Sequence, residues 1–313
     1  MSGPVTTSDV PPIEGRTEGR PACVELHDSR PSQVGALPVR RALPRRARRT
    51  VGAWCYADHM GPVAVTEDHG LDLGPHPHIG LQTVTWLLAG EVLHRDSLGT
   101  EQLIRPGELN LMTAGHGVAH SEEATGRYRG DLHGIQLWVA QPDATRHGPA
   151  AFEHHASLPA VDLACGAATV VVGELDGTRS PARRDTDHLG VDLELRVGRT
   201  SLPLRPDHEH GLIVLEGAVT AHSTRVASGQ LAYLGTGREE LVLDVDDEAR
   251  VFLLGGAPFE EPLLMWWNFV ARTTAEIDDA CEGWPGDDDR FGVVASPLAL
   301  IPAPVPSWRG GQR

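Results

Sequence analysis

Short stretches that favour β-strands are separated by glycines at regular intervals in the first half of the chain. By subtraction, the separations between successive glycines are 9, 8 and 8 residues for Gly90, Gly99, Gly107 and Gly115. The stretches bounded by these glycines are short and β-compatible, and they lie at 83–88, 91–96, 102–105 and 109–113. Turns spaced in this way are typical of antiparallel strands in a sandwich or barrel. The pattern therefore predicts an all-β fold.

The second half of the chain repeats the pattern of the first more loosely. The segment 88–92, Leu-Ala-Gly-Glu-Val, resembles 215–219, Leu-Glu-Gly-Ala-Val. In the same way 107–115 resembles 229–237, and both begin and end on glycines separated by 8. An internal duplication is the economical explanation, so we expect two similar β domains.

The end of the chain departs from this strand rhythm. Thr273 and Thr274 are followed by Glu276, which is typical of the start of a helix. A short C-terminal helix is therefore expected over 275–282.

Composition fits this fold class and narrows the possible partners. Aromatic residues make up only 5% of the chain, which has 35 glycines and 24 prolines, as expected for short strands and many turns. The formal net charge of −16 opposes direct binding to nucleic acid, because its field repels phosphates. An arginine-rich run at 40–49 is a local exception that could contact a partner. A solvated basic segment is the simpler interpretation.

The cysteines and the start of the chain bear on location. Four widely scattered cysteines form no C-x-x-C pair, so neither a zinc knuckle nor a disulfide framework is indicated. No signal-peptide pattern opens the chain, and no apolar run is long enough to span a bilayer. We expect a cytoplasmic protein that does not bind membranes. A monomer is expected, because two barrels can cover each other's edges.

Two short histidine motifs carry the chemistry of the first domain: His76-Pro-His78 and His120-Ser-Glu122. Side chains two residues apart on a strand point the same way, so each motif offers two donors to one point. Three imidazoles and a carboxylate suit a divalent transition metal better than calcium or magnesium. The sequence predicts a metal site of His76, His78, His120 and Glu122. The competing interpretation is a set of polar residues that line an empty barrel mouth.

A second pair, His208 and His210, invites the same interpretation in the second domain. His78 lies 12 residues before Gly90, whereas His210 lies only 7 before the matching Gly217. When the offsets of the first site are applied to the second domain, only Asp244 falls on a position that could coordinate a metal. We therefore expect no metal in the second domain, and we expect His208 and His210 to lie in a loop or at the rim of a cleft.

These patterns divide the chain into four parts. We expect a disordered tail at 1–20, a metal-binding domain at 21–145, a linker at 146–160 and a metal-free domain at 161–313.

Longer motifs around these histidines resemble the pirin family of bicupins. They lie at 74–86, 90–97, 112–122, 136–139 and 266–270. The resemblance covers most of the chain and implies two cupin domains, each a β-sandwich or jelly-roll barrel. It also implies one metal, usually iron as Fe(II), held by the N-terminal domain at His76, His78, His120 and Glu122. The sequence departs from the family pattern at Ile79, where arginine is common, and at Gln82, where glutamate is common, so substrate preference or metal tuning could differ.

The resemblance implies two classes of function. The preferred one is a dioxygenase of the quercetin 2,3-dioxygenase type, which uses dioxygen to cleave the ring of a flavonol or related enol. Glu122 would then be the catalytic base, and the partners would be a small phenolic or enol substrate and dioxygen. The alternative is a redox-sensing, iron-binding regulator that acts through a protein partner, either as a transcription cofactor or as a modulator of a metabolic enzyme. A metal-binding cupin with another small enol or diketone as substrate is a third interpretation, because fold does not fix the reaction.

Overall fold

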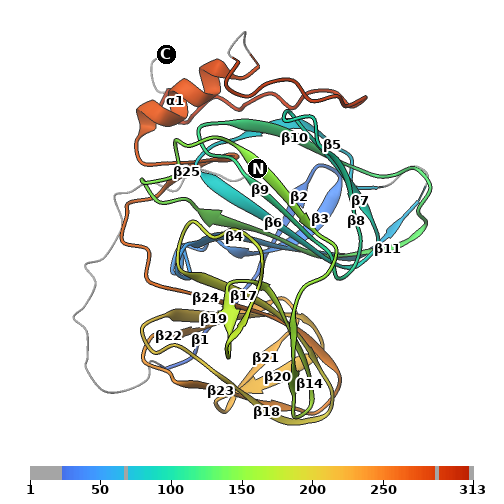
Figure 1. The fold of residues 1–313 in the computed structure, drawn as a ribbon, viewed down its shortest axis with the longest axis vertical. Coiled ribbons are helices and arrows are strands. Elements are labelled where there is room, and N and C mark those ends of the chain that lie inside the picture. The colour runs from blue at the N-terminus through green and yellow to red at the C-terminus, as the bar shows by residue number, and fades with distance from the viewer. Residues whose placement is uncertain (1–22, 67–69, 286–288, 310–313) are drawn as a thin grey trace.

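Two similar β units, one above the other in Figure 1, make up most of the molecule. The computed structural model describes residues 23–66, 70–285 and 289–309. The predicted tail, 1–20, lies outside the described residues. The fold class is as predicted: an all-β chain with two cupin-type domains and one short C-terminal helix.

The first unit contains a larger and a smaller antiparallel sheet. The larger sheet has the spatial order β12 (Ala151–His155), β9 (Leu109–Thr113), β6 (Leu81–Ala89), β11 (Gly130–Ala140), β4 (Trp54–Val65), β3 (Leu37–Leu43) and β2 (Arg30–Val34). The smaller sheet has the order β5 (Leu73–His78), β10 (Val118–Glu123), β7 (Val92–Asp96) and β8 (Glu101–Ile104).

The second unit is built in the same way. Its larger sheet has the order β1 (Glu25–Asp28), β22 (Gln230–Gly235), β19 (Glu209–Glu216), β24 (Ala249–Gly256), β17 (His188–Leu195), β14 (Gly166–Val172) and β13 (Ala160–Leu163). Its smaller sheet has the order β18 (Gly198–Pro203), β23 (Glu240–Val245), β20 (Ala218–Ala221) and β21 (Thr224–Ala227). Two hairpins complete the strands, β15 (Glu174–Leu175) with β16 (Thr178–Arg179), and β25 (Leu264–Trp266) with β26 (Phe269–Ala271).

The repeated strand order supports an internal duplication, but one edge strand of each larger sheet comes from outside the range expected for its domain. In the first unit β12 pairs with β9, and it lies within 146–160, the range expected to be a linker. In the second unit the corresponding edge beside β22 is taken by β1, which comes from the start of the chain. The strands of one sheet therefore come from both sides of the expected boundaries, because sheet edges accept any free strand of suitable register.

The larger sheets of the two units pack face to face and form a shared apolar core. Trp54 of β4 is fully buried there, and its indole N–H lies 3.1 Å from the carbonyl oxygens of both Leu189 and Gly255 in the second unit. Trp86 of β6 donates to the carboxylate of Asp192 at 2.9 Å. These strands are covered on both faces, which explains why β6 is buried without interruption from Leu81 to Leu87 although it includes polar residues.

After the second unit the chain returns to the first and covers one end of it (Figure 1). A β-bridge joins Ile79 to Phe269, and α1 (Thr274–Gly283) follows. The predicted helix is confirmed, and the hydroxyl of Thr273 accepts a hydrogen bond from the Glu276 N–H at its N-terminus. Within the described parts of the chain, no helix combines the length and the apolar character needed to cross a bilayer.

Candidate metal centre

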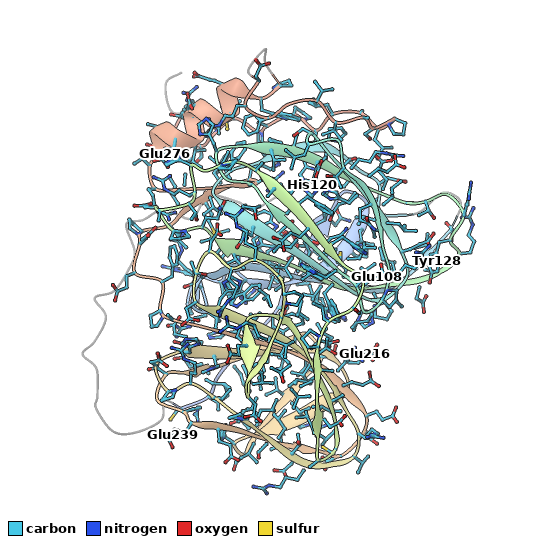
Figure 2. The ribbon with its side chains drawn as sticks, viewed as in Figure 1. Glu108, His120, Tyr128, Glu216, Glu239 and Glu276 are labelled. Atoms are coloured by element: carbon cyan, nitrogen blue, oxygen red, sulfur yellow. The ribbon has the colours of Figure 1, made fainter. Side chains whose placement is uncertain are left out.

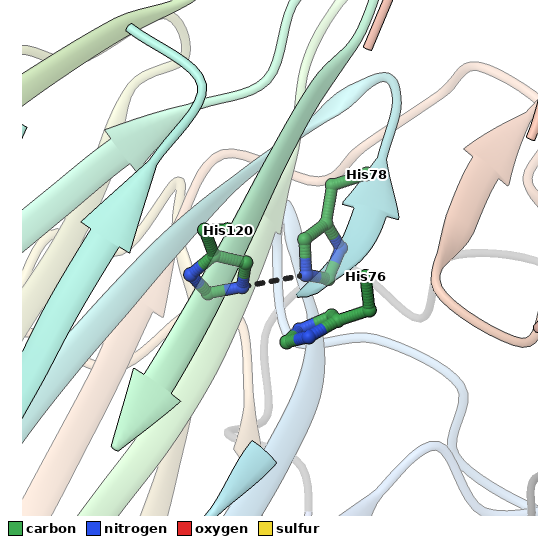
Figure 3. A group of neighbouring side chains, drawn as sticks. All are labelled: His76, His78 and His120. Atoms are coloured by element: carbon green, nitrogen blue, oxygen red, sulfur yellow. Dashed lines mark hydrogen bonds between the residues drawn. The ribbon is translucent and has the colours of Figure 1, made fainter. Parts of the chain in front are cut away.

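Three buried histidines meet where β5 and β10 pair. His76 is the direct partner of His120 in the antiparallel register, and His78 lies two residues along β5 on the same face. Their exposed fractions are 4%, 1% and 1% for His76, His78 and His120. One ring nitrogen from each lies within 4.8 Å of the others, and Figure 3 shows the three rings converging. The pairing register thus brings together imidazoles from residues as far apart in sequence as His76 and His120, which are 44 positions apart.

The carbonyl contacts of His76 and His78 are made through Nδ1, so Nε2 of each ring faces the other imidazoles. His76 Nδ1 lies 2.9 Å from the Gly74 carbonyl oxygen, and His78 Nδ1 lies 3.0 Å from the Asn268 carbonyl oxygen. An N–H at Nδ1 satisfies each carbonyl, so each Nε2 keeps its lone pair. The Nε2 atoms of His78 and His120 are 3.1 Å apart, a spacing that two ligands of one metal ion have.

A chain of hydrogen bonds orients His120. Its Nδ1 lies 3.3 Å from His94 Nδ1, and His94 Nε2 lies 3.2 Å from the carboxylate of Asp96. Asp96 also accepts the backbone N–H groups of Leu98 and Thr100, which fix its position. Both contacts are satisfied when His120 donates to His94 and His94 donates to Asp96. His120 Nε2 then points into the cluster as a lone pair.

Burial keeps the three imidazoles neutral, which metal binding requires. Desolvation lowers the pKa of His76 to about 4, against the opposing effect of its hydrogen bond to Gly74. Desolvation, reinforced by the neighbouring imidazoles, holds the pKa values of His78 and His120 well below the ordinary value. The residues present therefore fit a transition metal.

Glu122 lies close to the imidazole group but outside it. The β5–β10 register shifts between His120 and Glu122, so Glu122 pairs with Leu73, and the three imidazoles alone form the group within 4.8 Å. Burial raises the pKa of Glu122 to about 7, although a hydrogen bond with Thr85 opposes this. Its role as a fourth ligand stays a prediction. The shift in register shows why regular strand alternation does not fix its distance from the imidazoles.

The imidazoles and Glu122 line one cavity of about 410 Å³. Its remaining walls are largely apolar or aromatic, with side chains that include Met60, Leu71, Leu73, Trp138, Trp267 and Ile301. Tyr56 stacks on Trp138 with ring centroids 4.0 Å apart, and Trp138 meets His78 edge to face at 5.2 Å. A planar aromatic molecule of moderate size has complementary surfaces here.

One wall of this cavity holds a charged cluster that the sequence interpretation missed. Arg41 is only 2% exposed, and its Nε and Nη2 donate to the two carboxylate oxygens of Asp58 at 2.8 and 2.6 Å. Tyr56 donates its hydroxyl to Asp58 and accepts from Arg41, both at 2.5 Å. The interpretation of the 40–49 run as solvated was therefore wrong for Arg41. The signal for this was its position two residues after the buried Val39 on β3, because residues two apart on a strand point to the same face.

The two departures from the family pattern have different surroundings. Ile79 is buried in the apolar cluster formed by the C-terminal segment, next to Phe269. Gln82 is fully buried and donates to the Thr113 hydroxyl at 2.9 Å, while its carbonyl oxygen has no hydrogen-bond partner in the described residues. Neither residue lines the cavity. At position 79, the arginine that is common in the family is thus replaced by an apolar contact with Phe269.

In the second unit, His208 and His210 line a separate cavity, and Asp244 lies elsewhere. The Asp244 carboxylate is exposed and forms an ion pair with Arg199 at 3.4 Å. Figure 2 shows His120 in the upper unit, whereas Glu216 and Glu239 lie in the lower one. Within the described ranges, the group of His76, His78 and His120 is the one cluster of three or more side chains spaced for a metal.

Comparisons with known proteins agree with this architecture. The model of the Pirin family matches residues 36–139, and that of the Pirin C-terminal cupin domain matches 190–291. A Pseudomonas aeruginosa protein named "Putative quercetin 2,3-dioxygenase" is 46% identical over 299 residues, which cover 92% of this chain and 94% of the relative. A pirin-like protein of Caulobacter vibrioides is 35% identical, with 83% of this chain and 92% of the relative covered.

A solved structure shows the same fold. The crystal structure of a quercetin 2,3-dioxygenase from Acinetobacter baumannii superposes with a TM-score of 0.87 at 43% identity, and covers 90% of this chain and 95% of that one. Both units of this chain match family models, and the relatives align over nearly its whole length. The chain therefore belongs to the pirin family.

Proposed function

We propose that this protein is a metal-dependent dioxygenase of the quercetin 2,3-dioxygenase type, with a flavonol or related enol as substrate. The observation that carries the proposal is the shared cavity: three neutral imidazoles converge there beside a carboxyl group whose pKa is raised to about 7. The printed names of the Pseudomonas relative and the Acinetobacter structure support this reaction class.

His76, His78 and His120 would hold the metal, with Glu122 as a fourth ligand, and Fe(II) is the metal we propose. Neutral imidazoles with a carboxylate suit divalent transition metals. When bound, such a metal would supply Lewis acidity and the one-electron chemistry that reaction with dioxygen requires. Asn268 and the His94–Asp96 pair would keep the imidazoles aimed at it.

Glu122 is the group best suited to accept a proton from the substrate. A phenol or enol hydroxyl must lose its proton to become electron-rich enough to react with dioxygen. With a pKa of about 7, the Glu122 carboxylate is available at neutral pH and is a stronger base than an ordinary glutamate. The proton of the substrate hydroxyl would move to a carboxylate oxygen of Glu122.

The cavity walls fit a flat, largely apolar substrate. Its volume of about 410 Å³ lies within the range of roughly 300–1,000 Å³ that is usual for small-molecule sites. Trp138 and Trp267 offer aromatic surfaces, and Arg41 with Asp58 adds polar groups on one side. A flavonol presents rings and hydroxyl groups of this kind.

Oxygen uptake with quercetin tests the proposal. Iron-loaded wild type should consume dioxygen, and Glu122→Ala protein of equal measured iron content should lose about 100-fold or more in kcat. Glu123→Gln is the matched control. Glu123 is its neighbour in sequence and is buried, but it pairs with Arg95 and Ser121 away from the cavity. No turnover by fully metallated wild type would exclude quercetin and favour a regulatory role or another enol substrate.

A further inference from the structure

A second cavity, of about 600 Å³, opens at one end of the second unit. It lies beside the first residues of β17 and β19, next to the β15–β16 hairpin, and no part of the proposed reaction uses it. Leu175, Leu189 and Leu204 form apolar parts of its wall, while His208 and His210 supply imidazoles. The cavity therefore combines apolar surface with polar side chains, as small-molecule sites do.

His210 is a buried polar group without a partner. Its side chain is 1% exposed, and neither ring nitrogen has a hydrogen-bond partner within the described parts of the chain. Gly255 pairs with it on β24, and a Cβ at that glycine would lie 3.1 Å from the His210 ring, so the glycine leaves room for the imidazole. Buried polar atoms are nearly always hydrogen-bonded, which makes two unpaired nitrogens at a cavity wall evidence for a missing partner.

Most charged side chains of the wall are paired with one another. Asp187 accepts from Arg184 at 3.1 Å and from Arg205 at 2.7 Å, and it lies 3.3 Å from His208 Nε2. Across the cavity Arg179 pairs with Glu174 at 2.7 Å. Burial lowers the pKa of His210 to about 4, so its ring is uncharged at neutral pH. Two side chains of the wall keep unpaired nitrogens in the described residues, namely His210 and, at Nε2, the buried His188. The uncharged His210 ring offers one N–H donor and one lone pair.

We propose that this cavity binds a small neutral molecule that carries ring hydroxyl groups, with one hydroxyl bonded to His210. A hydroxyl both donates and accepts, so it can satisfy either imidazole nitrogen. The leucine walls would cover the apolar face of the ring. A metal ion fits less well, because the ring centroids of His208 and His210 are 6.1 Å apart and, among the described residues, no three ligand atoms of this cavity lie within 4.8 Å of one another.

Phenols and sugars both carry ring hydroxyl groups, and one probe of each class distinguishes between them. Catechol and D-glucose would each be titrated into full-length protein labelled with ¹⁵N-histidine and loaded with Zn²⁺, which keeps the first site diamagnetic. The imidazole resonances of His210, assigned with His210→Gln, should shift and saturate with one of the probes. Binding of catechol in the first cavity is distinguished because it shifts His76, His78 and His120 instead.

His210→Leu should weaken binding of the active probe at this site by about 10-fold or more, while His210→Gln should retain part of it. His154→Gln is the control, because His154 is half-buried in the first unit and does not line this cavity. Leu204→Trp narrows the cavity and leaves His210 unchanged in sequence, and it should also weaken binding. This second variant tests the proposal if His210→Leu fails to fold. The proposal is wrong if neither probe shifts His210, or if both cavity variants bind as well as wild type.

Discussion

The two units share one strand order but differ in what their smaller sheets present. In the first unit, β5 and β10 direct histidines inward, at His76, His78 and His120. In the second, the corresponding strands β18 and β23 direct Leu202, Leu241 and Leu243 into an apolar core. The same fold therefore accommodates either histidines or leucines inside the barrel, and a few inward-facing residues decide whether it can bind a metal.

Replacement of an imidazole in the first unit should have the largest effect. His120→Ala removes one of three converging ligands, and we expect less than about a tenth of the wild-type iron content together with loss of oxygen uptake. Metal analysis after dialysis measures this. Asp244→Asn, at the offset-matched position of the second unit, should keep the metal content unchanged, because that carboxylate is exposed and paired with Arg199. Equal metal loss in both variants would contradict the assignment.

The pH dependence of kcat should also be determined by a residue of the first unit. Burial alone raises the pKa of Glu122 to about 7, and the positive charge of bound iron would lower it from there. The kcat for quercetin should therefore rise about 10-fold for each pH unit up to a midpoint below 7 and level off above that midpoint. Glu122→Gln protein with equal iron content should lose this dependence. A profile that rises with the same midpoint in Glu122→Gln would assign the titration to another group.

The hydrogen bonds behind His120 should have a smaller effect. Asp96→Asn weakens the chain that orients His94 and His120, and we expect metal affinity to fall by about 10- to 100-fold. Competition with a chromogenic chelator measures the affinity. The circular dichroism spectrum should stay that of wild type. Unchanged affinity would mean that the strand register alone positions His120.

The contact between the units should have the smallest effect. Trp86→Phe removes the hydrogen bond from the indole N–H to Asp192, which still accepts from Arg250 at 2.7 Å. We expect a loss of about 1 kcal/mol in the free energy of unfolding in urea. Metal content should not change. A loss several times larger would show that this indole is needed for packing between the sheets rather than for one hydrogen bond.

Local patterns were sufficient for much of this structure. Glycine spacing and strand alternation predict the all-β fold, the duplicated unit and the facing of His76 and His78, because all of these depend on residues close in sequence. Other features depend on long-range pairing that no local pattern specifies. These include the place of β1 in the second unit, the bulge before Glu122 and the burial of Arg41 against Asp58.

The carbonyl of Asn268 shows how far such pairing reaches, since it contacts the His78 imidazole from 190 residues away. During synthesis, the strands of the first unit leave the ribosome long before Asn268 does. His78, Trp267 and Ile301 can therefore form the finished cavity only when the chain is almost complete. A nascent first unit would have its histidine strands without the wall that closes them, so full metal retention should be acquired late, after the last segment has docked.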